Sequence, residues 1–289
     1  MTTTPAAVAL ATGRGGAQLV RFAWLELQSC VFAVAVFAGL AAAYVVPLPI
    51  ATYDALLAWC LLVTLAFWAL GLESWREVLV VLAFHTIGLA LEMFKVHQGS
   101  WSYPGDAVTK VAGVPLFAGF MYAAVGSYIC QAWRRFDLRV HRYPALGTTL
   151  VAVLVYANFY THHWLPDLRV ALAVLGIVVL RRTTVHFTVA DRRYRMPLAL
   201  SFALIGLFLW LAENLATLLE AWQYPDQADA WHTVHVAKIG SWALLVTMSF
   251  VLVATVKAQE GRLYHSPDHS PDHSPDHSPD HSPDHSPDH

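Results

Sequence analysis

The chain has 289 residues, of which 57% are hydrophobic and 13% are charged, and tryptophan occurs 11 times. A soluble domain of this size could not remove so much apolar surface from water, so the composition excludes an ordinary soluble enzyme and indicates a membrane protein. The formal net charge of -2 and the scattering of basic residues among separate connections give no reason to expect nucleic acid as a partner.

The first 20 residues are rich in Thr, Ala and Gly, and we expect a disordered cytoplasmic N-terminus over residues 1–20. Over residues 21–257, apolar runs long enough to cross about 30 Å of hydrocarbon then occur eight times. This pattern predicts an all-α fold, a multi-pass transmembrane helix bundle. The expected spans lie near residues 25–47, 54–71, 78–96, 111–133, 145–163, 164–180, 196–221 and 236–257.

Connections rich in arginine alternate along the chain with connections that contain few basic residues, and this alternation is the usual signal for the orientation of a protein in a membrane. Several Arg residues lie in the connections at 134–144 and 181–195, whereas residues 48–53 and 223–235 contain no Lys or Arg. The basic connections belong in the cytoplasm, so both termini are expected there. The glutamates and aromatic turns described next then fall on the opposite side of the membrane.

One polar pattern occurs twice. Glu92 stands nine residues ahead of a Trp-Ser-Tyr-Pro turn at 101–104, and Glu213 stands nine residues ahead of Trp-Gln-Tyr-Pro at 222–225. The spans that carry the two glutamates both run outward. The duplication therefore predicts a parallel four-plus-four internal repeat. Repeat A would cover about 21–133 and repeat B about 145–257.

Glu92 and Glu213 are the candidate catalytic residues. A charged side chain at the centre of a bilayer costs about 2.5 to 3.5 kcal/mol on insertion scales, so such a residue is a functional candidate with a partner to be found. Glu92 lies near the end of its span, where Lys95 could form an ordinary ion pair with it. An equally weighted alternative is that both glutamates accept hydrogen bonds from the aromatic turns and hold the two repeats together.

The aromatic residues of the two turns are expected to bind substrate, although Trp and Tyr are also favoured where a helix meets the lipid head groups. Asn214 shares a helix face with Glu213, and His85 lies deep in the span that carries Glu92. His85 could relay a proton or only bond a neighbouring backbone group. The expected substrate-binding set is Trp101, Tyr103, Trp222, Tyr224, Asn214 and His85.

Histidines suggest a metal only weakly. His162 and His163 end the fifth span, and adjacent histidines are more often interfacial than metal ligands. The sequence requires no cofactor, although it is compatible with a bound divalent metal ion. Residues 258–289 carry six His-Ser-Pro-Asp units that start at His265, and proline at every fourth position excludes helix. We expect a disordered, His-rich cytoplasmic tail that binds divalent metals weakly at most.

The chain contains the strings Glu92-Met-Phe-Lys95, residues 99–104, 113–122 and 158–163, and Ala212-Glu213-Asn214. These strings resemble a bacterial family of integral membrane proteins known as domain of unknown function 817. The likeness covers about Arg21 to Lys257 and implies an inner-membrane location without an activity. A fainter likeness is to membrane carotenoid hydratases and small-subunit lycopene cyclases, through Glu92, Tyr103, Asp106 and residues 113–116, with a departure at 117–122 that leaves the substrate open.

Three functions compete. The first is a cofactor-independent enzyme on a lipid or isoprenoid, carotenoid-like substrate, with Glu92 and Glu213 as general acid and base at the outer side. The second is a secondary transporter or proton-coupled permease built on the repeat. The third is a non-catalytic membrane scaffold. The expected partners are membrane lipid and a hydrophobic small molecule.

Overall fold

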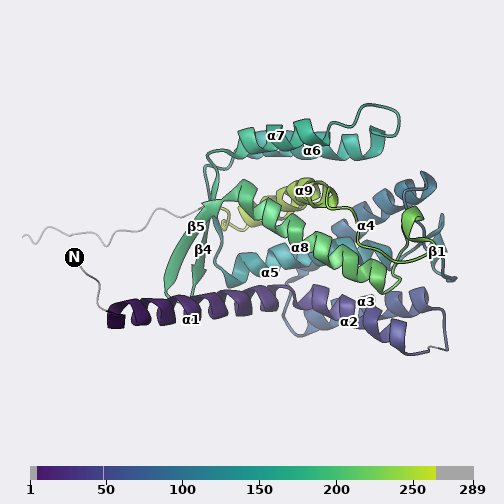
Figure 1. The fold of residues 1–289 in the computed structure, drawn as a ribbon, viewed down its shortest axis with the longest axis horizontal. Coiled ribbons are helices and arrows are strands. Elements are labelled where there is room, and N and C mark those ends of the chain that lie inside the picture. Colours follow the sequence, from purple (N-terminus) through teal and green to yellow (C-terminus); the bar gives the residue numbers. More distant parts are fainter. Residues whose placement is uncertain (1–4, 48, 265–289) are drawn as a thin grey trace, which may run out of the picture.

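The computed structural model of the protein describes residues 5–47 and 49–264, with side chains from residue 15 onward. Within these residues the chain is mostly helical (Figure 1). The disordered tail is predicted over residues 258–289, and its residues 265–289 lie outside the described residues. Residues 258–264 differ from that prediction, because the last described helix continues to Gln259 and Leu263 is buried. The helices are α1 (Pro5–Ser29), α2 (Val31–Val45), α3 (Thr52–Ala69), α4 (Trp75–His97), α5 (Ala118–Arg135), α6 (Ala145–Thr161), α7 (Arg169–Leu180), α8 (Leu198–Leu218), η1 (Pro225–Gln227) and α9 (Lys238–Gln259).

Four of the described helices, α3, α4, α8 and α9, are long and apolar enough to cross a membrane. Residues 15–29 of α1 and 31–45 of α2, which meet at a bend of 64°, would form a fifth span if this bent pair of helices crosses the membrane as one span. Helix α7 has 12 residues, and at 1.5 Å per residue it extends roughly 18 Å, which is short of the hydrocarbon thickness. The expected helical membrane protein is thus confirmed, while the count of eight spans stays a prediction.

The start of the chain differs from the expectation of disorder over residues 1–20, because helix α1 begins at Pro5. Proline suits the first position of a helix, and the Ala-rich sequence that follows has high helix propensity. Phe22 of α1 also packs against Phe136 and Phe187, with ring centroids 5.5 and 6.1 Å away. Tertiary packing of this kind cannot be read from the composition of a short segment.

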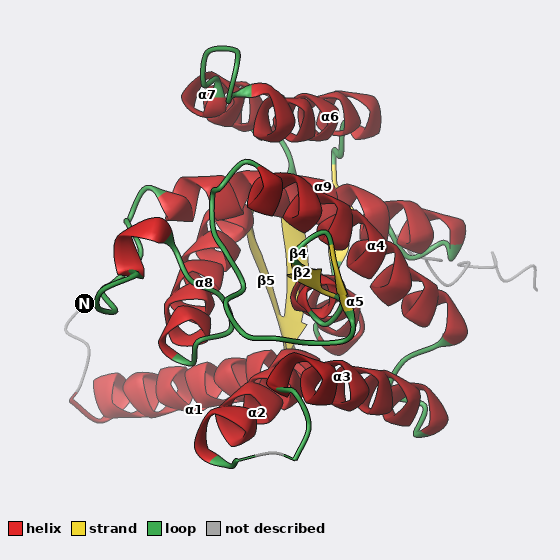
Figure 2. Ribbon diagram, turned by 90° about the vertical axis from the view of Figure 1, so that its right-hand side faces the viewer, coloured by secondary structure: helices red, strands yellow, loops and turns green. Residues whose placement is uncertain are grey.

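The helices lie in three groups. Helices α6 and α7 lie on one side of the molecule, α1 to α3 lie on the opposite side, and α4, α5, α8 and α9 fill the space between them (Figures 1 and 2). Helix α2 packs on α3 and α5, and α6 packs in the same way on α7 and α9. The tightest pairs are α4 with α5 and α8 with α9. Large apolar side chains such as Phe32, Val81, Trp133 and Phe250 form the core between these groups.

Short strands occur at two places where the sequence predicted none: at the start of the span expected at 111–133, which is helical only from Ala118, and at the basic connections. Strands β1 (Lys110–Val111) and β2 (Val114–Pro115) form a tight hairpin before α5. Strands β3 (Arg139–His141), β4 (Thr184–Val189) and β5 (Arg192–Pro197) form an antiparallel sheet in which β4 is central. This sheet joins the basic connections at one end of the bundle, and its β4 strand packs against α1.

Candidate functional site

Glu92 is a hydrogen-bond acceptor at both carboxylate oxygens, and its side chain is buried. Trp101 Nε1 and Tyr103 OH donate to Oε2 over 2.6 and 2.7 Å, and Tyr122 OH donates to Oε1 over 2.6 Å. The chain reaches this arrangement because α4 ends at His97 and Gly99 takes a φ of +68°, which reverses its direction. Three donors on one carboxylate form what we call the Glu92 cluster.

Glu213 on α8 is buried in a matching environment, the Glu213 cluster. Tyr224 OH donates to Oε1 of Glu213, and Trp242 Nε1 donates to Oε2 over 2.8 Å. The reversal after α8 uses Glu220, whose φ is +57°. Glu220 follows Glu213 by seven residues, the same interval that separates Gly99 from Glu92.

The two aromatic turns contact each other directly. Ser102 and Gln223 exchange backbone hydrogen bonds of 2.9 and 3.0 Å in an isolated antiparallel bridge. These two residues occupy the same place in their respective Trp-x-Tyr-Pro motifs. Next to the bridge, the Trp101 and Tyr224 rings pack edge to face with centroids 6.0 Å apart. The Glu92 and Glu213 clusters are therefore neighbours.

Both clusters border one large cavity of about 1030 Å³. Its wall follows α5 from Met121 to Phe136, a length of roughly 22 Å at 1.5 Å per residue. Most of the lining is apolar, whereas Glu92 and Glu213 lie at the end formed by the aromatic turns. This volume is at the upper limit of ordinary small-molecule pockets, which span about 300 to 1,000 Å³.

The hydroxyls of the turns are poor acids. Burial, reinforced by the charge of Glu92, raises the pKa of Tyr103 well above its usual range. Burial and the charge of Glu213 act on the pKa of Tyr224 in the same direction. Both tyrosines therefore keep their protons at neutral pH and can hold hydrogen bonds to the carboxylates.

The other expected substrate-binding residues divide between the cavity and the scaffold. Trp222 lines the cavity, as Trp101 does. Asn214 instead holds the last long loop, because its amide bonds the backbone of Trp210 and Val234 over 2.7 and 2.8 Å. His85 packs on the Phe120 ring at 4.4 Å, and its Nδ1 has no hydrogen-bond partner among the described residues. Neither Asn214 nor His85 borders the cavity.

The lysine and histidines near Glu92 pair in a way the sequence did not indicate. Lys95 does not form the ordinary ion pair with Glu92, and its Nζ lies 3.1 Å from Nε2 of His163. The rings of His162 and His163 are adjacent, with centroids 4.3 Å apart, and Nδ1 of His162 lies 3.0 Å from the Asn158 carbonyl. In the described part of the chain, no three His, Cys, Asp or Glu side chains are grouped as metal ligands.

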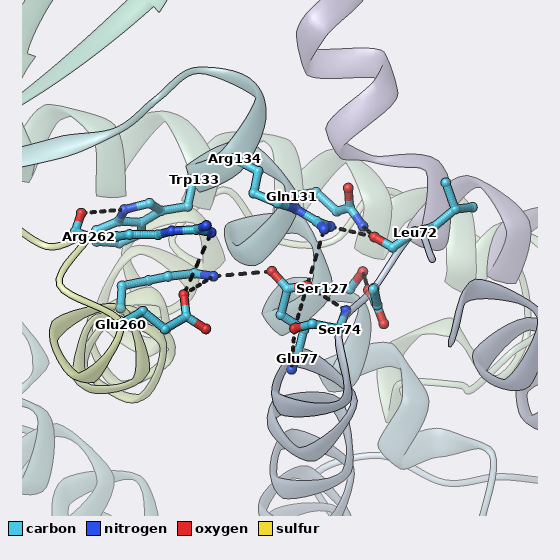
Figure 3. Close-up of polar contacts among 11 residues, drawn as sticks. Leu72, Ser74, Glu77, Ser127, Gln131, Trp133, Arg134, Glu260 and Arg262 are labelled. Carbon is cyan, nitrogen blue, oxygen red and sulfur yellow. Dashed lines mark hydrogen bonds and ion pairs between the residues drawn. The ribbon is translucent and has the colours of Figure 1, made fainter. Parts of the chain in front are cut away.

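The structure also shows a buried polar group that sequence reasoning missed, which we call the Glu77 cluster (Figure 3). Glu77 on α4 accepts from Lys257 of α9 over 3.2 Å and faces Arg134 of α5 over 3.4 Å. Lys257 also contacts Glu260 over 3.1 Å. The Ser74-x-x-Glu77 capping box was the available signal, since it marks the start of α4. The partner 180 residues away leaves no trace in the local pattern.

Trp242 and Tyr122 were also not anticipated as donors. They follow Glu213 and Glu92 by 29 and 30 residues respectively, and this difference of one residue means that the spacing which matches the two turns does not align them.

Comparison with known proteins gives a family match. The family model described as "Protein of unknown function (DUF817)" matches residues 18–250. The chain is similar to "Uncharacterized protein YoaT" of Bacillus subtilis strain 168, with 50% identity over 242 residues that cover 83% of this chain and 92% of that protein. No solved structure matches the chain.

Proposed function

This chain belongs to the DUF817 family, and we propose that it is a membrane enzyme that acts on a lipid or isoprenoid substrate held in the large cavity. The observation that carries the proposal is the placement of Glu92 and Glu213. Both carboxylates come from different helices, both are buried, and both lie on the wall of a single, mostly apolar cavity. An apolar pocket with a few convergent polar groups is the usual form of a small-molecule site.

The chemistry that fits this arrangement is proton transfer to and from carbon. One glutamic acid would add its proton to a carbon-carbon double bond, water would add at the other carbon, and the second glutamate would take the proton that water releases. Trp101 and Tyr224 lie beside the reacting groups, and their ring faces stabilise positive charge. Tyrosine hydroxyls can donate to a carboxylate or accept from a carboxylic acid, so they can serve either protonation state.

The proposal includes a transmembrane domain at residues 21–257 in the bacterial inner membrane, with eight spans, both termini in the cytoplasm and a four-plus-four repeat. Three features of the structure support the repeat. Glu92 and Glu213 each accept a hydrogen bond from the tyrosine of the turn that follows, the direction of the chain reverses seven residues after each, and α2 and α6 pack on corresponding helices. The reciprocal Ser102–Gln223 bridge is the contact that a two-fold axis between equal halves produces.

The test compares the lipids of cells that produce the wild type with those of cells that produce Glu92→Gln, Glu213→Gln or the double variant. Mass spectrometry of total lipid extracts should show a hydrophobic product only with the wild type, and its precursor should accumulate with the double variant. Removal of a catalytic acid or base typically lowers turnover by about 10²- to 10⁴-fold. A wild-type lipid profile from the double variant would contradict the enzyme. Loss of the folded protein in both single variants would instead favour the scaffold.

The length of the cavity favours transport as a second candidate. Its wall runs from Trp101 in the first aromatic turn to Phe187 in strand β4, at the end of the bundle that carries the basic sheet. A passage of this extent would suit a carrier of hydrophobic molecules. Movement of a fluorescent fatty acid across sealed vesicles, lost in the Glu92→Gln/Glu213→Gln protein without any chemical change to the lipid, would select transport over catalysis.

A further inference from the structure

The end of the cavity that holds the glutamates also holds three cations. Lys95, Lys238 and Arg169 all border the cavity there, together with the Ser241 hydroxyl. They come from three separate helices, α4, α9 and α7. Convergence of positive side chains from distant parts of the sequence at one end of an apolar space requires an explanation beyond helix packing.

Of the three cations, Lys95 gives the strongest evidence for a bound anion, because only 4% of its surface is exposed. Its ammonium contacts the neutral acceptor His163, and no carboxylate lies within ion-pair distance of it among the described residues. A buried charge is costly unless an opposite charge and hydrogen bonds compensate for it. The folded chain itself supplies little compensation at this place.

Lys238 is held beside the cavity without forming a close ion pair. Its Nζ donates to Tyr224 OH over 3.0 Å and lies 4.6 Å from the centroid of the Tyr224 ring and 5.5 Å from that of Trp101. The carboxylates of Glu92 and Glu213 are occupied by aromatic donors instead. Arg169 is paired with Asp167, and its NH1 also donates to Ser241 over 2.9 Å.

We propose that Lys95 and Lys238, supported by Arg169 and Ser241, bind the anionic head group of an amphiphile whose apolar chain lies along the rest of the cavity. The head group is a phosphate or a carboxylate, because both present oxygens that accept from several ammonium and guanidinium donors at once. The inference rests on the proposed function and narrows its substrate class from any hydrophobic molecule to one with a charged end. It also fixes the orientation, with the charged end beside Glu92 and Glu213.

The binding test uses the full chain in lipid nanodiscs with two probes of equal chain length, geranylgeranyl monophosphate and geranylgeraniol. The phosphate should bind at least about tenfold more tightly than the alcohol. This preference should disappear in the Lys95→Gln/Lys238→Gln protein and should persist in Lys95→Arg. The matched control is Arg182→Gln, which removes an exposed cation that does not border the cavity.

A second measurement does not depend on any probe. Replacement of an uncompensated buried ammonium by an apolar side chain of similar length should raise the melting temperature of the lipid-free protein, so Lys95→Met should melt higher than the wild type. The same variant should lose the preference for the phosphate. A lower melting temperature together with an unchanged preference would show that Lys95 is merely structural and would overturn the proposal.

The remaining outcomes separate this inference from the proposed function. Equal binding of alcohol and phosphate, both blocked by Ala212→Phe on the cavity wall, would overturn the head-group site and leave the apolar substrate site intact. Failure of both probes to bind would overturn both. Displacement of geranylgeranyl monophosphate by an equal concentration of inorganic phosphate would assign the lysines to a free anion and reject the amphiphile.

Discussion

At the scale of single residues, Glu220 shows how the duplicated architecture constrains the backbone. Its φ of +57° lies in the left-handed region, which costs an ordinary residue roughly 1–2 kcal/mol and costs glycine little. The corresponding reversal after α4 uses Gly99. The side chain of Glu220 is exposed, so its own packing does not fix this backbone conformation. The conformation is required because the turn that follows must reach Glu213.

We therefore expect Glu220→Gly to raise the free energy of unfolding by about 0.5 to 1 kcal/mol, since relief of strain outweighs the entropy that glycine loses on folding. Denaturant unfolding in detergent measures the change. Glu220→Ala is the matched control, because it removes the same carboxylate but keeps the β-carbon. An equal gain in both variants would attribute the effect to charge instead of backbone conformation.

At the scale of elements, the Glu77 cluster joins the start of α4 to the ends of α5 and α9. Lys257 and Glu77 are almost wholly buried and 3.2 Å apart, so each compensates for the charge of the other. Removal of one partner from a buried pair leaves an isolated charge and typically costs about 3–5 kcal/mol. The cluster thus holds three helices at a fixed spacing at the end of the bundle opposite the aromatic turns.

In Lys257→Met, Arg134 still faces Glu77 over 3.4 Å, so we expect the free energy of unfolding to fall by about 3 kcal/mol, at the lower end of that range. Adding Glu77→Gln should recover part of that loss. Glutamine at position 77 still completes the capping box with Ser74, so this variant isolates the charge from the helix cap. Arg262→Gln, which disrupts the exposed contact at 3.9 Å to Glu260, should change stability by less than about 1 kcal/mol. Thermal unfolding of the purified protein compares these three variants with the wild type, and equal losses in Lys257→Met and Arg262→Gln would contradict the argument.

Elements that the sequence predicted well are those with a strong local signal. The long apolar runs identify α4, α8 and α9, and the spacing from Glu92 and Glu213 to the aromatic turns identified a site whose members do contact one another. The sheet of β3, β4 and β5 was missed because its strands are short and lie in basic connections. The sequence suggested Lys95 only as an ion-pair partner of Glu92. The cavity that Lys95 shares with Lys238 depends on how α4 and α9 pack, and periodicity carries no information about that packing.

At the scale of the whole molecule, the Ser102–Gln223 bridge offers a direct test of the arrangement of the two halves. Residues that exchange both backbone bonds across antiparallel strands have α-carbons about 5.5 Å apart, which suits a disulfide. Ser102→Cys/Gln223→Cys should therefore close a disulfide under mild oxidation and shift on a non-reducing gel. The background should lack Cys30, Cys60 and Cys130, which are free in the structure. Ser102→Cys/Asp229→Cys is the control, and equal crosslinking of both pairs would reject the bridge.

The cavity combines equivalent glutamates with lysines that have no equivalents. When Glu92 is aligned with Glu213, the position that corresponds to Lys95 is Ala216, and when the first residues of α5 and α9 are aligned, the position that corresponds to Lys238 is Ala118. The scaffold is then nearly symmetric, whereas the charge inside it is not. A single bound molecule would therefore contact two glutamates that differ in their surroundings. With one molecule bound per chain, each glutamate would have a different role in the reaction. Such a site has a stoichiometry of one and distinguishes the two faces of the molecule it holds, so its product would carry one defined stereochemistry.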